Sequence, residues 1–246
     1  MSELHGKVAI VTGAAGPMGA AAARALADAG CRVALIDLPG EKLSALASTI
    51  AQAVAVPADL AWLPALQRAA ASIEQELGGA DILCNNAGVL SNAKALETDE
   101  AEWRRVLTIN LDAAFFLARA VIPAMRRRRW GRIINTSSLA AKTGGLTAGT
   151  AYAVSKGALC SLTFSLAREL ARDGITVNGI APAYVRTPMV TEALTDAQRT
   201  QLLQSIPVGR FCEPEEFAHV VRFLADPLAG FITGEIIDLN GGLHMD

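Results

Sequence analysis

Residues 12–19 read TGAAGPMG and stand between an apolar run, Val8–Thr12, and an alanine-rich helical stretch, Ala20–Ala29. Glycines let the backbone come close to a pyrophosphate, and the N-terminus of the following helix favours its negative charge. A second apolar run ends at Asp37, eighteen positions after Gly19. A carboxylate there can accept hydrogen bonds from both hydroxyls of an adenosine ribose. The stretch therefore predicts a dinucleotide site at the carboxyl ends of two neighbouring strands.

Short apolar runs alternate with helical stretches along the rest of the chain. The expected strands are Val8–Thr12, Arg32–Asp37, Ile82–Asn85, Arg132–Thr136, Thr176–Ile180 and Glu235–Leu239. The expected helices are Ala20–Ala29, Lys42–Gln52, Trp62–Leu77, Glu100–Arg128, Tyr152–Arg172 and Pro214–Ala225. Uniformly apolar strands are typical of parallel sheets that are buried on both faces, and the alternation implies right-handed crossovers. We predict an α/β fold, a Rossmann-like doubly wound parallel sheet in a three-layer αβα sandwich.

The boundaries of these elements carry further expectations. Gly30, Gly131 and Gly174 lie just past the expected helices, where a left-handed residue is favoured. No linker divides the chain, so we expect one domain over residues 1–246. The irregular stretch 182–210 follows a strand and is expected to form a lid, since ligands of such sheets lie beyond the carboxyl ends of strands.

Composition excludes several classes of protein. The 246 residues are 52% hydrophobic and 19% charged, which excludes a disordered chain. The formal net charge of −2 gives no field that attracts nucleic acid or an anionic membrane. No uninterrupted apolar run reaches the roughly 18 residues of a spanning helix, and the first residues lack a signal-peptide pattern. We expect a cytoplasmic protein. The four Cys and three His are too scattered for a zinc or disulfide framework, so no metal site is expected.

The residues around Asp37 favour NAD over NADP. Its carboxylate would repel a 2′-phosphate, and neither TGAAGPMG nor the LPG after Asp37 contains a Lys or Arg. Two plainer interpretations stay open at this point. The glycine-rich loop could be an ordinary strand–helix turn, and Asp37 a solvated residue at a strand end.

Later motifs extend the pattern over the whole chain. They are Asp59 in PADL, NNAG at 85–88, Asn110 in TINL, Ser138 in INTSS, YAVSK at 152–156 and VNGIAPAYVRTPM at 177–189. With TGAAGPMG, these motifs resemble those of the classical short-chain dehydrogenases/reductases along essentially the full length. Two positions depart from that family: Pro17 stands where a Gly is usual, and Ala183 replaces the usual Gly after Pro182. A Pro at the first helical position is tolerated, so the resemblance still implies a phosphate contact from the Met18 N–H.

Tyr152 and Lys156 lie four positions apart and share one face of the expected helix. The resemblance implies that they, with Ser138 and Asn110, are the catalytic residues. A nearby ammonium lowers the pKa of a phenol from about 10, so Tyr152 can exchange a proton with an alcohol or carbonyl while hydride moves separately. The Ser138 hydroxyl can hydrogen-bond the substrate oxygen, with Ser137 as the rival. Asn110 is expected to disrupt its helix and to hold a water that links Lys156 to solvent.

The same resemblance implies a set of cofactor contacts. They are Gly13, Met18, Gly19, Asp37, Asp59, Leu60, Asn86, Ala87, Gly88, Tyr152, Lys156, Pro182, Val185 and Thr187. In this set Lys156 holds the nicotinamide ribose, and Thr187 with the Val185 backbone holds the carboxamide. Taken alone, the Tyr152–Lys156 pair could be a surface pair, and Asn86 and Ala87 could reflect sheet packing.

These residues predict an NAD-dependent oxidoreductase that interconverts a secondary alcohol (a polyol, sugar or cyclic alcohol) and its ketone. An apolar substrate pocket is expected from Leu139, Ala140, Leu146, Ala183, Tyr184, Met189 and Val190. The alternative is an NADPH-dependent 3-oxoacyl-[acyl-carrier-protein] reductase, whose basic helix ends dock an acidic carrier. The run Arg126–Arg129 fits that reading, whereas Asp173 beside Arg172 and the carboxylate of Asp37 oppose it.

Two readings from other classes are weaker. An NAD-binding sensor would lack part of the catalytic set, which is complete here. Nucleic-acid binding through Arg126–Arg129 and Arg132 conflicts with the slightly acidic chain, and cations at a helix end are favoured by its dipole. The long helices Glu100–Arg128 and Tyr152–Arg172 carry more apolar residues than one buried face needs, so we expect a homo-oligomer. The family resemblance implies that this oligomer is a homotetramer.

Overall fold

The structure, a computed structural model, describes residues 4–187 and 195–245. Its centre is a seven-stranded parallel sheet with the order β3-β2-β1-β4-β5-β6-β7. The strands are β1 Val8–Thr12, β2 Arg32–Asp37, β3 Ala53–Pro57, β4 Ile82–Asn85, β5 Gly131–Thr136, β6 Ile175–Pro182 and β7 Ile236–Leu239. The order reverses between β1 and β4, which is where a doubly wound sheet opens a crevice at its carboxyl edge.

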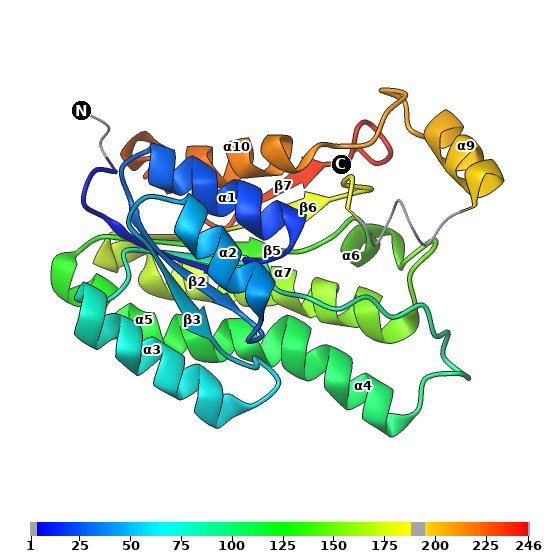
Figure 1. Cartoon of the computed structure of the whole chain (residues 1–246). Coiled ribbons are helices and arrows are strands. Elements are labelled where there is room, and N and C mark those ends of the chain that lie inside the picture. The colour runs from blue at the N-terminus through cyan, green and yellow to red at the C-terminus, as the bar shows by residue number, and fades with distance from the viewer. Residues whose placement is uncertain (1–3, 188–194, 246) are drawn as a thin grey trace.

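Helices cover both faces of the sheet (Figure 1). One face carries α1 Pro17–Asp28, α2 Glu41–Thr49 and α10 Pro214–Ala225. The other carries α3 Leu63–Leu77, α4 Glu100–Leu107, α5 Ala113–Arg128 and α7 Thr150–Leu170. The short α6 Ala140–Thr143 and the outlying α9 Asp196–Ser205 lie at the carboxyl edge. The predicted three-layer fold is confirmed.

Strand periodicity divides the core into two layers. Successive side chains of a strand point to opposite faces. Ala9 and Val11 therefore pack with α1 and α10, whereas Val8 and Ile10 pack with α3, α5 and α7. Because both layers are apolar, the central strands are buried on both faces and β1 is apolar from Val8 to Val11, which is the pattern seen in the sequence.

Two local predictions were wrong for identifiable reasons. The edge strand β3 was missed because Ala53–Pro57 is short, half-exposed and ends in Pro, which is tolerated at a sheet edge. Gly131 does not cap a helix: Arg129 adopts the left-handed conformation after α5 (φ 54°), and Gly131 begins β5. A Cβ at Gly131 would lie 2.6 Å from the Met125 sulfur, so the glycine serves close packing.

The long helix Glu100–Arg128 is interrupted. Residues Thr108–Asp112 form a π-helix, η1, between α4 and α5. By length and hydropathy alone the helical stretch Glu100–Arg128 could cross a membrane, but side chains such as Val106, Leu117, Val121 and Met125 are buried against the rest of the fold. A core helix of a globular domain passes the same test.

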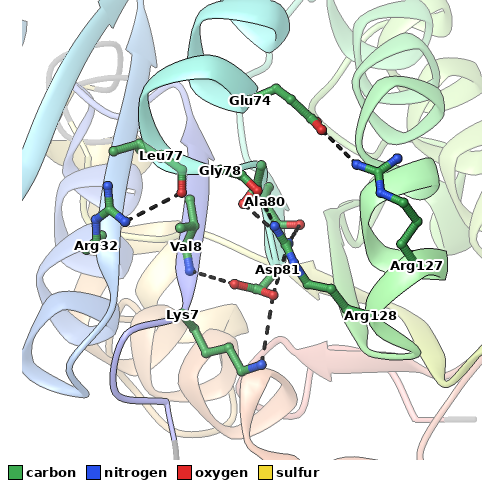
Figure 2. A network of polar contacts seen from close by, with 11 residues as sticks. Lys7, Val8, Arg32, Glu74, Leu77, Gly78, Ala80, Asp81, Arg127 and Arg128 are labelled. Atoms are coloured by element: carbon green, nitrogen blue, oxygen red, sulfur yellow. Dashed lines mark hydrogen bonds and ion pairs between the residues drawn. The ribbon is translucent and has the colours of Figure 1, made fainter.

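An ionic network holds the amino edge of the sheet together (Figure 2). The buried Asp81 accepts a hydrogen bond from the Val8 N–H at 2.9 Å and pairs with Arg128 at 3.2 Å and Lys7 at 3.8 Å. Arg128 also donates to the carbonyl groups of Gly78 and Ala80 after α3. The network joins β1, β4 and two helices at the edge opposite the crevice.

Candidate active site

A cavity of about 580 Å³ opens at the carboxyl ends of β1, β2 and β4. It brings together almost all of the predicted cofactor-binding residues. Those that line it are Gly13, Met18, Gly19, Asp37, Asp59, Leu60, Asn86, Ala87, Gly88, Tyr152, Lys156, Pro182 and Thr187. Val185 is the exception, because it lines a neighbouring cavity instead.

The glycine-rich loop is shaped by close backbone approach. Gly13 has φ +62°, and a Cβ there would lie 2.8 Å from the Cα of Ala87. A Cβ at Gly19 would lie 2.2 Å from the Gly13 carbonyl oxygen. Pro17 is the first residue of α1, and no side chain caps that helix end. The free N–H groups of its first turn therefore border the cavity, as an anion site requires.

Two carboxylates at the adenosine end are held by backbone groups. Asp37 accepts hydrogen bonds from the N–H groups of Ala15, at 2.8 Å, and Leu38, at 2.7 Å. Asp59 accepts one from the Ala61 N–H at 2.9 Å. Each ionised carboxylate has about four acceptor positions, so both retain capacity for ribose or base donors.

The NNAG segment is tied to the phosphate loop. The Asn86 side-chain amide donates to the Thr12 carbonyl at 3.0 Å and the Gly13 carbonyl at 3.3 Å. The backbone N–H groups of Asn86 and Ala87 both donate to the Thr12 hydroxyl at 3.0 Å. Asn86 and Ala87 therefore line the cavity and also connect the ends of β1 and β4 by hydrogen bonds.

Ser138 and Tyr152 stand between two cavities. Both residues line the dinucleotide cavity and also a second cavity of about 500 Å³. Ser138 follows β5; its hydroxyl oxygen accepts a hydrogen bond from the Ala140 N–H at 3.1 Å and lies close enough to the Tyr152 phenol to affect its pKa. Ser137, the rival to Ser138, is turned away, since its hydroxyl donates to the Lys156 carbonyl at 2.9 Å. Of the two, Ser138 is therefore the serine that borders both cavities beside Tyr152.

Burial shifts the pKa values of Tyr152 and Lys156. Burial raises the pKa of the Tyr152 phenol above its usual value, and the neighbouring Ser138 hydroxyl opposes that shift only in part. Burial lowers the pKa of the Lys156 ammonium to about 8. The expectation that Lys156 dominates and lowers the tyrosine pKa is therefore not met in the protein alone. Lys156 lies 5.8 Å from the centre of the phenol ring and donates to the Thr136 carbonyl at 2.7 Å.

Asn110 lies in the π-helix, so the helix is disrupted where the family resemblance implied. Its side chain is buried and clamps Val89, accepting from the N–H at 2.8 Å and donating to the carbonyl at 3.0 Å. It also donates to Ser155 at 3.0 Å, on the helix that carries Tyr152. A Cβ on Gly88 would lie 3.2 Å from the Lys156 side-chain nitrogen and 3.3 Å from the side-chain amide oxygen of Asn110. Gly88 thus keeps Lys156 and Asn110 close to the cavity.

The second cavity is the candidate substrate pocket. The predicted residues that line it are Leu139, Ala140, Leu146, Ala183 and Tyr184. Met189 and Val190, and the 188–194 part of the expected lid, lie outside the described residues. Tyr184 is a bulky residue with φ +47°, a strained conformation of the kind that concentrates at functional sites. From α9, Leu202 reaches the same cavity.

Among the residues of the dinucleotide cavity that the sequence did not indicate, three are informative. Leu38 and Lys42 line it beside Asp37, and Thr136 lines it beside Ser138. The position of Lys42, five residues after Asp37, is the signal that could have found it. The buried Thr136 hydroxyl has no hydrogen-bond partner among the described residues. This unused polar group, with the glycine cradle and the uncapped helix end, fits a nicotinamide dinucleotide. In the described part of the chain, no group of three or more His, Cys, Asp or Glu could hold a metal ion.

Comparisons with known proteins agree with this geometry. A family model described as enoyl-(acyl carrier protein) reductase matches residues 13–244. A 3-oxoacyl-[acyl-carrier-protein] reductase FabG of Vibrio cholerae is 39% identical over 255 residues, covering 99% of each chain. Nodulation protein G of Rhizobium sp. is 39% identical over 246 residues, covering 100% of each. A solved structure of a candidate gluconate dehydrogenase from Agrobacterium tumefaciens superposes with a TM-score of 0.92 at 31% identity, over 98% of this chain and 96% of that one.

These relatives correct the substrate prediction. The leading expectation, an NAD-dependent dehydrogenase of a polyol, sugar or cyclic alcohol, is wrong. Full-length relatives named as 3-oxoacyl-[acyl-carrier-protein] reductases support the alternative instead. The error has a plain cause: the choice leaned on Asp37, a residue that bears on the cofactor and carries no information about the substrate.

Proposed function

Because the chain belongs to the classical short-chain dehydrogenase/reductase family, we propose that it reduces the 3-oxo group of an acyl thioester carried by acyl carrier protein, giving the 3-hydroxyacyl thioester. The observation that carries the proposal is the position of Ser138 and Tyr152 on the boundary between the dinucleotide cavity and an apolar cavity. A ketone held there meets a hydride donor on one side and a proton donor on the other.

The two side chains have separate tasks in the reduction. The Ser138 hydroxyl donates a hydrogen bond to the ketone oxygen and stabilises the charge that develops on it. The nicotinamide, when bound, supplies the hydride to the ketone carbon. Tyr152 gives its proton to the oxygen as the C=O π bond breaks, and it is left as a phenolate. The raised pKa of the phenol keeps this proton in place until then.

Lys156 and Asn110 support the proton transfer. The Lys156 ammonium, held 5.8 Å from the centre of the Tyr152 ring, stabilises the phenolate and holds the nicotinamide ribose. Asn110 fixes Val89 and the Tyr152-bearing helix through the contacts described above, beside the Lys156 amine. We propose that a proton returns to Tyr152 from solvent through Lys156 and a water held beside Asn110.

The remaining contacts follow the shape of the cavity. The glycine loop and the Met18 N–H receive the pyrophosphate, and Asp59 and Leu60 receive the adenine. Gly88, Pro182 and Thr187 line the nicotinamide end with Tyr152 and Lys156. Val185 reaches the carboxamide through its backbone, from the base of the substrate pocket.

We propose NAD as the preferred cofactor, with NADP disfavoured. The carboxylate of Asp37 lines the cavity and keeps acceptor positions beyond its two backbone contacts, to which ribose hydroxyls can donate. A 2′-phosphate at that position would meet a negative charge. This feature separates the present proposal from the NADPH-dependent alternative considered from the sequence.

The arginine run does not support carrier docking beside the active site. Arg126 pairs with Asp173 at 2.7 Å and Glu169 at 3.1 Å, Arg127 pairs with Glu74 at 2.8 Å, and Arg128 pairs with Asp81 (Figure 2). The run also precedes β5, whereas Ser138 follows it, so the two lie at opposite edges of the sheet. A carrier on this surface would need to serve the active site of another subunit.

We also propose a homotetramer that works in the cytoplasm. Phe115 and Phe164, on the two long helices, and Phe223 and Phe231, near the C-terminus, are at least 38% exposed, which is unusual for large apolar side chains. All four cysteines are free thiols, which suits a reducing compartment. Light scattering at micromolar concentration should return four times the 25.7 kDa chain mass; a monomeric mass would refute the assembly.

The substrate proposal is tested by a panel. Wild-type protein with NADH should reduce 3-oxoacyl thioesters on carrier protein, and mass spectrometry should detect the 3-hydroxyacyl product. Oxidation of sugars, polyols and cyclic alcohols with NAD should be far slower. The opposite ranking would reject the proposal.

A further inference from the structure

Resting on the NAD preference proposed above, we infer that Lys42 can act as a cationic partner for a 2′-phosphate, so that Asp37 is the residue chiefly responsible for rejecting NADP. Lys42 lies in the first turn of α2 and lines the dinucleotide cavity together with Asp37, Leu38 and Asp59. The site therefore contains a cation at the end where the two cofactors differ.

Lys42 stands apart from the other lysines of the chain. Lys7 pairs with Asp81 at 3.8 Å, and Lys142 pairs with Asp238 at 2.7 Å. Lys94 and Lys156 donate to the backbone carbonyls of Ala148 and Thr136. Lys42 is exposed and has no hydrogen bond or ion pair with any described residue. Its ammonium is available for a ligand.

The charges around the adenosine end decide the balance. Asp37, Asp59 and the exposed Glu41 are negative, and Lys42 is positive. Asp37 is the carboxylate that is fixed against the phosphate loop, through the Ala15 N–H, and we expect it to lie beside the adenosine ribose. Its repulsion of a 2′-phosphate exceeds the attraction of a single flexible lysine on the rim. Once Asp37 is neutral, Lys42 remains as the cation that lines this end of the cavity, and the preference for NAD should narrow or reverse.

The test measures cofactor dissociation constants by titration calorimetry, with no substrate present. Asp37→Ala and the near-isosteric Asp37→Asn should each bind NADP more tightly than wild type does. In either background, adding Lys42→Ala should weaken NADP binding about tenfold, the order of one charge-assisted contact, and weaken NAD binding at least several-fold less. Lys42→Arg should retain the NADP affinity, and the Lys42 effect should shrink in high salt.

Arg104→Ala is the matched control, because it removes one exposed positive charge on α4, outside the cavity. The inference fails if Lys42→Ala weakens NADP no more than Arg104→Ala does. It also fails if Lys42→Ala weakens both cofactors equally, which would place Lys42 on the shared pyrophosphate. A wild type that binds NADP as tightly as NAD would refute the proposed cofactor preference instead. Inactivity on 3-oxoacyl thioesters would refute the substrate proposal and leave the two conclusions on cofactor binding unchanged.

Discussion

The Lys156 nitrogen lies 2.7 Å from the carbonyl oxygen of Thr136, the last residue of β5, in a site where its side chain is almost fully buried. Most buried lysines pair with a carboxylate, whereas the Lys156 ammonium donates a hydrogen bond to an uncharged backbone carbonyl. Burial accordingly lowers its pKa to about 8. The protein thus holds a charge beside Tyr152 at a cost in folding free energy.

Replacing that charge should stabilise the fold. Lys156→Met should raise the free energy of unfolding at pH 7 by about 1–3 kcal/mol, less than the full linkage value because the hydrogen bond to Thr136 is lost. The unfolded chain binds the lysine proton more tightly than the native one does, so the wild type recovers stability as pH rises from about 8 toward 10. The gap should be large at pH 7 and small at pH 9.5 in denaturant unfolding, while cofactor affinity falls. A variant that is less stable at pH 7, or a pH-independent gap, would contradict this account.

The same ammonium should appear in the pH profile of reduction. Reduction needs a protonated Tyr152, whose pKa is raised, and a charged Lys156, whose pKa is about 8. The kcat/KM for 3-oxoacyl reduction should therefore be level at neutral pH and fall above an apparent pKa near 8, which belongs to the coupled pair. Initial rates between pH 6 and 10 measure it. A profile that stays level to pH 10 would remove Lys156 from the mechanism.

Gly13→Ala should abolish tight cofactor binding. The new methyl would lie 2.8 Å from the Cα of Ala87, and the residue would be strained at φ +62°. We expect at least a tenfold loss of NAD affinity and about 1–3 kcal/mol of stability. Gly78→Ala is the control, because Gly78 has φ +81° but no atom lies within 4 Å of the place that an added methyl would take. It should lose stability without losing NAD affinity; equal NAD losses would show that strain alone is responsible.

Asp81→Ala should separate stability from function. It leaves the Val8 N–H and the partly buried Arg128 without their carboxylate (Figure 2), a loss of about 2–4 kcal/mol. NAD affinity should not change, because the network lies at the edge opposite the cavity. Glu74→Ala, which breaks the exposed pair with Arg127, should cost less than about 1 kcal/mol. Equal losses of unfolding free energy for the two substitutions, measured by chemical denaturation, would contradict the claim that the buried Asp81 stabilises the fold more than the exposed Glu74–Arg127 pair.

The sequence was most informative where chemistry and periodicity coincide. The strands β1, β2 and β4 have the predicted bounds because short apolar runs between turn residues leave few alternatives, and α10 has them because Pro214 marks its first turn. Their strand ends then place TGAAGPMG, Asp37 and NNAG at one cavity. The edge strand β3 could not be found, because a half-exposed Ala–Val run carries no such pattern. Lys42 was missed for a different reason: a helix turn brings it back to the cavity, which local reading of the LPG segment does not show.

The protonation of Tyr152 also lay beyond the sequence. The four-residue spacing to Lys156 predicts a lowered phenol pKa, but the depth of burial decides the sign, and burial is a property of the packed structure. The substrate was likewise undetermined, since apolar residues such as Leu139 and Leu146 suit many ketones.

The central claim is that Tyr152 protonates the oxygen of a 3-oxoacyl thioester while NADH delivers hydride, and a single-turnover measurement tests it most directly. Wild type preloaded with NADH is mixed with a 3-oxoacyl carrier-protein thioester, and the decay of reduced-cofactor absorbance is followed. Tyr152→Phe should bind NADH normally but react about 10²–10⁴-fold more slowly, and its loss should exceed by at least about 100-fold that of Tyr184→Phe, the other tyrosine of the chain. A Tyr152→Phe protein that consumes NADH at a near wild-type rate would contradict the account.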